Sequence, residues 1–352
     1  MAINSSFWKD RTVFLTGHTG FKGGWMAHWL LDLGADIYGY SLNPPTRPNF
    51  FTETNLKKRI SASVIGDIRN PNKLAKAINH AQPEIVIHMA AQSLVRESYK
   101  TPVDTFSTNV LGTVNLLEIC RTVGTVKVIV NITTDKCYEN RERSRAFREN
   151  DRLGGYDPYS SSKACAEIAT VAYRNSFLKD AGIQVATVRA GNVIGGGDWA
   201  DDRLIPDFLR SLDTGKKLHI RSPNAVRPWQ HVLEPLSGYL MLAEKLVTTG
   251  SALAEAWNFG PDERDIKSVT WILEHLRSHI ADVKWEVSTT QQLHEASVLK
   301  IDSSKARSIL GWEPGWNLEV ALDKTVEWHQ AWRSGKDITA ITSEQIEEHR
   351  CA

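Results

Sequence analysis

The stretch TVFLTGHTGFKGGWMAHWLLDLG, residues 12–34, decides the fold. It opens on a short apolar run, continues with glycines at every third position (Gly17, Gly20 and Gly23), and ends in a helix-like segment. This order is typical of a dinucleotide-binding unit, because glycine lets backbone N–H groups of a loop and a helix N-terminus approach a pyrophosphate. The alternative is a glycine-rich turn ahead of a tightly packed helix.

More apolar runs follow this first strand, separated by amphipathic segments of helical length. They lie at 35–41, 61–66, 83–89, 126–133 and 185–190. Alternation of this kind predicts an α/β fold, a doubly wound parallel (Rossmann-type) sheet with helices on both faces. The runs are apolar throughout because parallel strands are buried on both sides.

The pattern changes after about residue 191. Helices are expected at 205–215, 233–247, 268–280, 303–311 and 317–332, and short strands at 217–220, 256–260 and 283–287. We therefore interpret the chain as three parts: a dinucleotide-binding Rossmann domain, a smaller mixed α/β substrate-binding domain with some strand exchange back into the first, and a C-terminal tail. Their bounds are 1–191, 192–336 and 337–352. The tail is either a polar helix or frayed, and the ligand is expected in the crevice outside the carboxyl ends of the parallel strands.

The composition favours a small-molecule partner. The chain has 42 basic and 41 acidic residues, so its net charge of +1 creates no field that would attract nucleic acid or a membrane surface. Its four cysteines form no CxxC pair and no metal-ligand spacing, which predicts reduced thiols, no metal and a cytoplasmic protein. Neither a leader pattern nor a membrane-spanning apolar run is expected.

Several residues near the glycine loop do not decide whether the cofactor is NAD or NADP. Lys22 would either pair with a phosphate or point to solvent. The second strand ends near Ser41 without the acidic residue that binds the adenosine ribose, and Arg47 or Lys22 could instead favour an extra phosphate, so the loop alone does not separate NAD from NADP. Asp67, in GDIRN, either reaches the adenine amino group or belongs to a helix N-cap region.

Two further motifs carry groups that can move protons. In YSSSK, Tyr159 and Lys163 lie one helical turn apart, and a nearby ammonium favours the phenolate and lowers the pKa of the tyrosine. In NITTDKCYEN, residues 131–140, Thr134, Asp135 and Lys136 follow one another at the end of a strand. The last two are either an ordinary solvated pair or two proton carriers in a site.

Together these motifs resemble those of the extended short-chain dehydrogenase/reductases: GHTGFKG, MAAQS, TTDKCYE and YSSSK occur in the family's order. More narrowly, the chain resembles the nucleotide-sugar 4,6-dehydratases. The combination GHTGFKGGW, GYSLNPPT, TTDKCYEN, GNVIGGGDW and RPWQHVLEPL is similar to the branch of that family that acts on CDP-hexoses. The resemblance runs from about residue 8 to about residue 332.

The resemblance implies an internal redox cycle on bound NAD: oxidation at the sugar C4, loss of water across C5 and C6, and return of the hydride to C6. Tyr159 would take the C4 hydroxyl proton, Thr134 would bond the same oxygen, and Asp135 would protonate the departing C6 hydroxyl. In the dTDP-glucose branch a glutamate follows the aspartate and serves as the C5 base. Here it is Lys136, which is either a base with a strongly lowered pKa or an electrostatic stabiliser of the enolate.

The resemblance also implies which residues bind the ligands. The residues expected to bind the cofactor are Gly17, Thr19, Gly20, Phe21, Lys22, Gly23, Ser41, Asp67, Ile68, Ala90, Ala91, Gln92, Asn109, Thr133, Tyr159 and Lys163. The residues expected to bind the CDP-hexose are Asn192, Trp199, Arg203, Arg221 and Arg227. Each arginine has a surface-charge alternative, and the RPWQHV context favours Arg227; Trp229 and His231 either pack the domain junction or touch substrate.

The sequence does not fix the nucleobase, so a dehydratase of the same family that acts on a UDP-, GDP- or dTDP-hexose is one alternative. Two other functions compete with a dehydratase. An epimerase of the same fold would return the hydride to C4 without an eliminating acid, and the aspartate of TTDK argues against it. A nucleotide sensor would keep the loop and lack turnover.

By analogy with the family we expect a homodimer, or a tetramer built from it, through helices at 102–123 and 159–179. The usual product route of the family leads to 3,6-dideoxysugars of surface polysaccharide.

Overall fold

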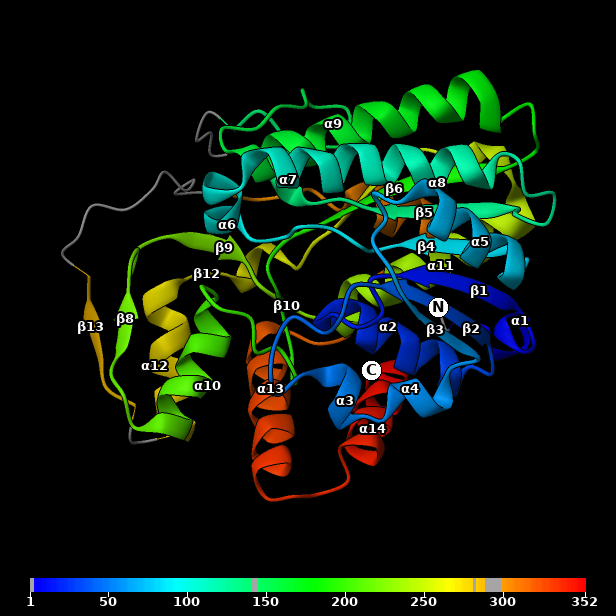
Figure 1. The fold of residues 1–352 in the computed structure, drawn as a ribbon. Helices are drawn as coiled ribbons and strands as arrows, with labels where there is room; N and C mark the ends of the chain where they lie inside the picture. Colours follow the sequence, from blue (N-terminus) through cyan, green and yellow to red (C-terminus); the bar gives the residue numbers. More distant parts are fainter. Residues whose placement is uncertain (1–2, 141–144, 281–282, 289–298) are drawn as a thin grey trace.

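A parallel seven-stranded sheet forms the centre of the computed structural model, which describes residues 3–140, 145–280, 283–288 and 299–352. The strand order is β11-β6-β5-β4-β1-β2-β3 (Figure 1). The strands are β1 (Thr12–Thr16), β2 (Asp36–Ser41), β3 (Ala62–Ile65), β4 (Ile85–His88), β5 (Val128–Ile132), β6 (Gln184–Ala190) and β11 (Ala256–Phe259). The order reverses between β1 and β4, the switch point at which doubly wound sheets bind ligands. The predicted fold class is confirmed.

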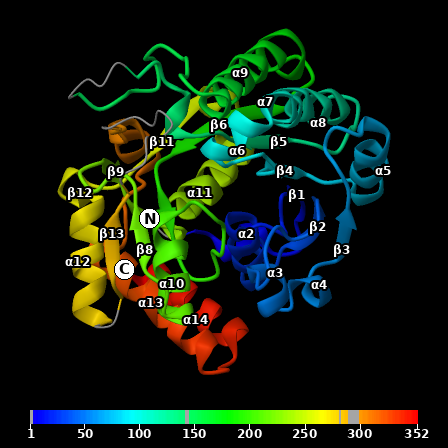
Figure 2. The same cartoon turned by 60° about the vertical axis from the view of Figure 1, so that its left-hand side comes forward.

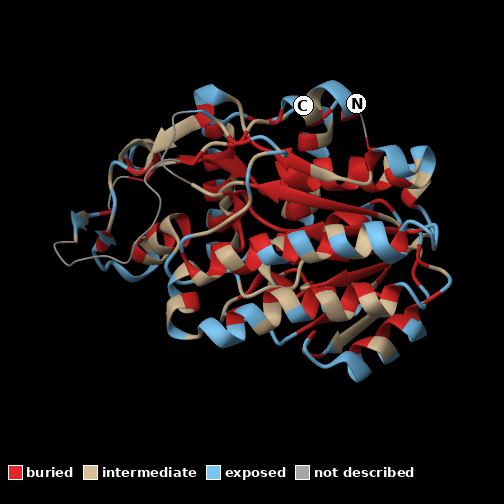
Figure 3. Ribbon diagram, turned by 90° about the horizontal axis from the view of Figure 1, so that it is seen from above, coloured by how far each residue is buried: buried red, intermediate tan, exposed pale blue. Residues whose placement is uncertain are grey.

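Helices cover both faces of this sheet. One face carries α5 (Pro71–Ala81), α8 (Gly112–Cys120) and α9 (Pro158–Tyr173), and the other carries α2 (Phe21–Asp32) and α11 (Leu233–Thr249). Successive side chains of β1 point to opposite faces of the sheet. Phe14 packs with the α5 and α8 side chains, whereas Val13 and Leu15 pack with those of α2 and α11. Figure 3 shows the strands buried between helices whose outer surfaces are exposed. Burial on both faces is why these strands are apolar along their length.

A second, smaller unit is built from the later part of the chain. It contains α10 (Leu204–Thr214), α12 (Val269–His279) and α13 (Leu318–Arg333), with the strand pairs β8 (Leu218–Ile220) and β13 (Trp285–Val287), and β9 (Val226–Pro228) and β12 (Ile266–Ser268). Its helices and strands share an apolar cluster that includes Phe208, Leu273 and Leu322. In Figures 1 and 2 this unit lies on the side of the molecule away from α5 and β3.

Strand β11 comes late in the sequence but belongs to the large sheet. The sequence placed it among the short strands of the second half, and it pairs in parallel with β6 at the sheet edge. Its side chains Trp257 and Phe259 are fully buried, which is the environment of a sheet strand between two helical layers. The domain bounds and the expected strand exchange between the two domains stay a prediction.

The C-terminal residues form a packed helix, α14 (Ile338–Cys351), which is the helical one of the two alternatives for the tail. Asp337 caps it by accepting from the backbone N–H groups of Thr339 and Ala340. The helix contacts α2 and α13, and Arg350 donates to Ser5 Oγ at 3.0 Å, so the two ends of the chain are neighbours (Figure 3).

The remaining elements are short. They are α1 (Ser5–Trp8), α3 (Phe50–Glu53), α4 (Leu56–Arg59), α6 (Val95–Lys100), α7 (Pro102–Phe106), β7 (Val193–Ile194), β10 (Gln230–His231), 3-10 turns at Asp135–Cys137, Ser251–Leu253 and Glu263–Asp265, and π-helical turns at Ser107–Leu111, Arg174–Leu178 and Ala306–Leu310. The expected helices at 102–123 and 159–179 therefore each contain a π-helical turn, and at 303–311 a π-helical turn stands in place of a regular helix. In the ranges that the structure describes, no helix has both the length and the apolar character needed to cross a membrane.

Glu244 on α11 holds the N-terminal residues and makes stability depend on pH. Its carboxylate accepts from Trp8 Nε1 at 2.6 Å and from the Asn4 backbone N–H at 3.1 Å. Burial raises its pKa to about 7. Because this pKa is higher in the folded than in the unfolded chain, the contribution to stability is present at acidic pH and is lost as the pH rises through about 7.

We therefore expect Glu244→Gln, which keeps the accepting oxygen without the charge, to melt close to the wild type at about pH 5 and above it at about pH 8. Calorimetric melting of both proteins at the two pH values measures this. A difference in melting temperature that does not change with pH would contradict the assignment.

Candidate active site

A cavity of about 760 Å³ lies at the carboxyl ends of the parallel strands, between the large sheet and the smaller unit. Its walls come from the glycine loop, from the segments after β4, β5 and β6, and from residues 197–207 and 218–222. The cavity is lined by every predicted cofactor, catalytic and substrate residue except Asn109. These residues therefore share one continuous surface, and their individual roles stay predictions.

The glycine loop leaves the start of α2 open to the cavity. A Cβ on Gly23 would lie 2.1 Å from the Gly17 carbonyl oxygen, and Gly17 itself has a φ of +81°. Gly20 is the N-cap and provides no side-chain hydrogen bond to the helix. The free backbone N–H groups and the positive end of the helix dipole therefore face the cavity, as a pyrophosphate requires.

Two hydroxyl groups lie near the end of β2, where the sequence has no acidic residue to bind the adenosine ribose. Thr19 Oγ1 and Ser41 Oγ are 2.7 Å apart, and Thr19 Oγ1 also donates to the Leu42 carbonyl at 2.8 Å. Asp67 lines the cavity and is not a helix cap, because Asn70 caps α5 by accepting from the Lys73 backbone N–H. Hydrogen bonds from Arg69 lower the pKa of Asp67.

Asn109 lies behind the cavity wall and not on it. Its side chain accepts from the Gln92 backbone N–H at 2.9 Å and donates to the Gln92 carbonyl at 3.0 Å and to Ser162 Oγ at 2.8 Å. The residue is 1% exposed. It therefore fixes the position of Gln92 relative to α9, and its expected contact with the cofactor stays a prediction.

Helix α9 brings Tyr159 and Lys163 to the cavity. Asp157 caps it and Pro158 occupies its first turn, so the helix starts just before the tyrosine. Burial raises the pKa of Tyr159 to about 12, and the hydrogen bond with Thr134 opposes this increase. Lys163 Nζ donates to the Ile132 carbonyl at 3.0 Å, and burial lowers its pKa to about 8. The expected lowering of the Tyr159 pKa is not found in the folded chain, where burial raises it.

Asp135 is 1% exposed, which excludes a solvated pair with Lys136. Thr134 Oγ1 donates to Asp135 Oδ1 at 3.1 Å, and Asp135 Oδ2 is buried without a hydrogen-bond partner among the described residues. Burial raises the pKa of Asp135, and the Lys136 ammonium partly counteracts it. An unpartnered buried carboxylate oxygen favours the protonated form, so Asp135 can act as a proton donor.

Lys22 points inward, not to solvent. Its Nζ donates to Tyr239 Oη at 2.8 Å and lies over the ring of that tyrosine. Burial lowers the pKa of Lys22 to about 7, with Lys163 adding like-charge repulsion. Tyr239 comes from α11 and did not emerge from the sequence, because its context is an ordinary amphipathic helix.

On the substrate side, arginines from the smaller unit face the cavity. Arg203 pairs with Asp198 at 2.9 Å, Arg221 donates to the Asp202 carbonyl at 2.9 Å, and Arg227 is 5% exposed. Arg96, which the sequence did not single out, lines the same wall and pairs with Asp202 at 2.7 Å. Guanidinium groups suit bidentate phosphate binding, so this wall can bind a diphosphate.

Trp229 and His231, for which the sequence left two possible roles, lie in different environments. Trp229 lines the cavity, and its Nε1 donates to the Lys267 carbonyl. His231 is fully buried outside it, in edge contacts with Trp25 and Trp316, so it packs the junction between the units. Within the described ranges, His, Cys, Asp and Glu side chains form no group of three that could hold a metal ion.

Comparisons with known proteins agree with this geometry. The family model for GDP-mannose 4,6 dehydratase matches residues 14–325. The CDP-glucose 4,6-dehydratase of Salmonella typhimurium is 50% identical over 356 residues, which cover 99% of each chain. The solved dTDP-glucose 4,6-dehydratase of Bacillus anthracis, in complex with NAD, is 23% identical with a TM-score of 0.76 and covers 93% of this chain and 98% of that one. The UDP-glucose 4-epimerase of Thermotoga maritima, solved with UDP-glucose, is 21% identical with a TM-score of 0.78, covering 91% and 99%. These two structures bear on the fold alone, which a dehydratase and an epimerase share.

Proposed function

Because the chain belongs to the GDP-mannose 4,6 dehydratase family, we propose that it is a CDP-glucose 4,6-dehydratase, a lyase that converts CDP-D-glucose to CDP-4-keto-6-deoxy-D-glucose and water. The observation that carries the proposal is the cluster of Tyr159, Thr134 and buried Asp135 beyond the carboxyl end of β5, in the cavity. The choice of the CDP-sugar rests on 50% identity with the Salmonella enzyme over 99% of both chains.

We infer that the cofactor is NAD, which when bound accepts a hydride from the sugar C4 and gives it back at C6. The uncovered start of α2 fits its pyrophosphate. Ser41 and Thr19 are the hydroxyl groups at the end of β2 that can bond the adenosine ribose. Arg47, one cation that the sequence offers for an extra phosphate, is exposed and does not line the cavity, and Lys22 is engaged by Tyr239. These positions favour NAD over NADP.

Tyr159 is the group placed to take the proton of the C4 hydroxyl. Its phenol shares a hydrogen bond with Thr134, so both can hold the same sugar oxygen. Positive charge at Arg203 stabilises the phenolate that proton transfer needs, against the burial that raises its pKa to about 12. We propose that Lys163, one helical turn along α9, adds to this effect.

Asp135 is placed to protonate the C6 hydroxyl as it leaves. The carboxyl is buried, and its free Oδ2 can hold the proton that it donates. Lys136 lines the same cavity but is only half-buried. A charged ammonium cannot accept the C5 proton, so we propose that Lys136 stabilises the negative charge that develops on the C4 oxygen and C5, and that another group lining the cavity accepts the C5 proton.

The test is an incubation of the purified protein with NAD⁺ and, separately, the CDP, dTDP, UDP and GDP derivatives of glucose. We expect only CDP-glucose to give a product that has lost water, identified by mass and by the alkaline absorbance of a 4-keto-6-deoxy sugar. A product isomeric with its substrate would show an epimerase, and silence with every nucleotide sugar would favour a sensor.

We further propose that the protein forms a homodimer through α7, α8 and α9. Five large apolar side chains of this layer are exposed in the single chain: Val103, Phe106, Leu111, Ile168 and Phe177. They lie on α7, on α9 and on the π-helical turns Ser107–Leu111 and Arg174–Leu178, on one side of the sheet (Figure 1). Exposed apolar clusters of this kind mark protein contacts.

Replacing Val103 and Ile168 together by glutamate is expected to convert the dimer to a monomer of 39.4 kDa. Light scattering after gel filtration measures the mass. Val287→Glu, at an apolar residue that is 53% exposed on β13, is the matched control and should leave the mass unchanged. A wild type that already elutes as a monomer would contradict the proposal.

We propose a cytoplasmic location, because all four cysteines are free thiols and a reducing compartment keeps them so.

A further inference from the structure

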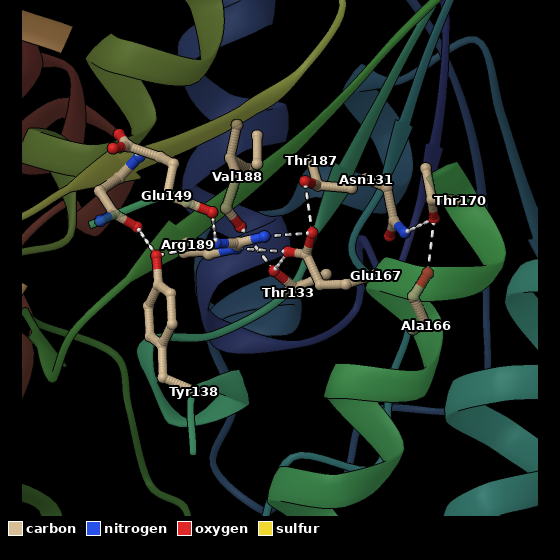
Figure 4. Close-up of polar contacts among 12 residues, drawn as sticks. Asn131, Thr133, Tyr138, Glu149, Ala166, Glu167, Thr170, Thr187, Val188 and Arg189 are labelled. Atoms are coloured by element: carbon tan, nitrogen blue, oxygen red, sulfur yellow. Dashed lines mark hydrogen bonds and ion pairs between the residues drawn. The ribbon is translucent and has the colours of Figure 1, made fainter. Parts of the chain in front are cut away.

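A fully buried ion pair lies behind the active-site turn, residues 133–136, which follows β5 and carries Thr134 and Asp135. Glu167 on α9 and Arg189 on β6 are 0% and 3% exposed. The guanidinium bonds the carboxylate through Nε at 2.9 Å and Nη2 at 2.8 Å (Figure 4). Neither residue lines the cavity, so the proposed chemistry does not use them directly.

The carboxylate of Glu167 is held in its ionised form. Thr133 Oγ1 donates to Oε1 and Thr187 Oγ1 donates to Oε2 at 2.6 Å, so with Arg189 each oxygen accepts twice. Burial alone would raise the pKa of Glu167, but Arg189 and the two hydroxyl groups bring it below its ordinary value. The arginine is fixed in turn, since its Nη1 donates to Tyr138 Oη at 2.8 Å.

A hydrogen bond and an electrostatic interaction connect this carboxylate to the reacting groups. Thr133 lies at the end of β5, next to Thr134, and lines the cavity. Lys163 is four residues before Glu167 on α9, one helical turn toward the cavity, and the negative charge of Glu167 raises its pKa against the effect of burial. The carboxylate therefore contacts one side of the site by a hydrogen bond and acts on the other by its charge.

The other titratable groups that interact with Lys163 cannot replace this charge. Cys137, on the turn after β5, is a neutral thiol because burial raises its pKa. His88, on β4, is neutral because burial lowers its pKa to about 3. Lys22, on α2, has a like charge and repels the ammonium. Glu167 is thus the anion that keeps this buried lysine charged, among the described groups that act on it.

We propose that Glu167 is a positioning residue for the dehydratase reaction, holding Thr133 at the end of β5 by a hydrogen bond and Lys163 in its cationic form by its charge. The proposal rests on the proposed function for its activity readout, and on the protein alone for its titration readout.

Thr133→Val and Thr187→Val test the hydrogen bond as a matched pair. Each removes one buried hydroxyl from the same carboxylate, but only Thr133 belongs to the active-site turn. We expect Thr133→Val to lower kcat by ~10-fold or more, in line with loss of a hydrogen bond to a charged group, and Thr187→Val to change it by less than about 2-fold. Equal effects of the two would overturn the positioning role.

Glu167→Gln tests the charge. The titration of Lys163 is followed without substrate, by NMR of protein carrying ¹³C-labelled lysine, with the resonance assigned from Lys163→Arg. We expect its midpoint to fall by roughly one pH unit or more in Glu167→Gln, and the alkaline limb of the activity profile to move with it. Thr187→Val should leave both where they are in the wild type. A midpoint that stays unchanged in Glu167→Gln would overturn the proposal.

Glu167→Gln leaves Arg189 buried without its counter-charge and can fail to fold, which its melting curve would reveal. The threonine pair then still tests the hydrogen-bond part of the proposal, since both variants keep the ion pair, and an equal effect of the two would overturn it. A wild type that turns over no nucleotide sugar would overturn the proposed function, whereas the titration of Lys163 would still report on Glu167.

Discussion

Tyr159→Phe is expected to lose activity by ~10²–10⁴-fold while the protein keeps its fold, as loss of a general base would cause. The phenol lines the cavity, is buried, and shares a hydrogen bond with Thr134. Phenylalanine keeps the ring and its packing but cannot take a proton from the C4 hydroxyl. Turnover of CDP-glucose measured as formation of 4-keto-6-deoxy product gives the size of the effect.

Tyr156→Phe is the matched control. This tyrosine lies three residues earlier, is 75% exposed and does not line the cavity. The same loss of one hydroxyl there should leave turnover unchanged. Wild-type activity in Tyr159→Phe would remove this residue from the chemistry and favour a sensor, which should be indifferent to the change.

Asp135→Asn is expected to separate oxidation from elimination. An amide cannot donate the proton that the departing C6 hydroxyl needs, so we expect formation of the dehydrated product to fall by ~10²-fold or more. With enzyme in excess over substrate, a sugar oxidised at C4 that has kept its C6 hydroxyl should accumulate and be detectable by mass. An epimerase would show no such block.

The melting temperature of Asp135→Asn shows whether its loss of elimination is due to unfolding. Burial raises the pKa of Asp135, so ionising this carboxyl is unfavourable in the folded protein. Its neutral amide variant should therefore melt no lower than the wild type. Asp180→Asn, at an exposed position on the surface, is the control for the same change of charge. Normal dehydration by Asp135→Asn would contradict the acid role.

The parts of the site that the sequence predicted are those in which neighbours along the chain act together. The glycine loop, the turn at 133–136 and the pair Tyr159 and Lys163 each span a few residues, so strand and helix periodicity places them. Their meeting at one edge of the sheet follows from the parallel topology, because carboxyl ends of parallel strands share an edge.

The parts that the sequence missed are contacts between distant positions. Tyr239 meets Lys22 across 217 residues, and Arg96 meets Asp202 across 106. Each lies on an ordinary amphipathic or polar segment, so no local pattern marks it. The hydrogen bonds of Asn109 to Gln92 and Ser162, behind the cavity wall, have no local signature either, and its contact with the cofactor stays a prediction.

Burial likewise has no local signature. The motif YSSSK suggests a tyrosine made acidic by its lysine, yet burial of Tyr159 raises its pKa to about 12. The same effect at Asp135 favours the acid form that elimination requires. Both shifts depend on how tightly the two units enclose the cavity, which only the folded chain determines.

The most direct test of the central claim follows the hydrogen at C4 of the sugar. CDP-glucose carrying deuterium at C4 is incubated with the protein and NAD⁺, and the product is analysed by mass and NMR. An internal redox cycle with elimination predicts a product that has lost water and carries the deuterium at C6. Deuterium that remains at C4 of a product isomeric with substrate would contradict the account and show an epimerase.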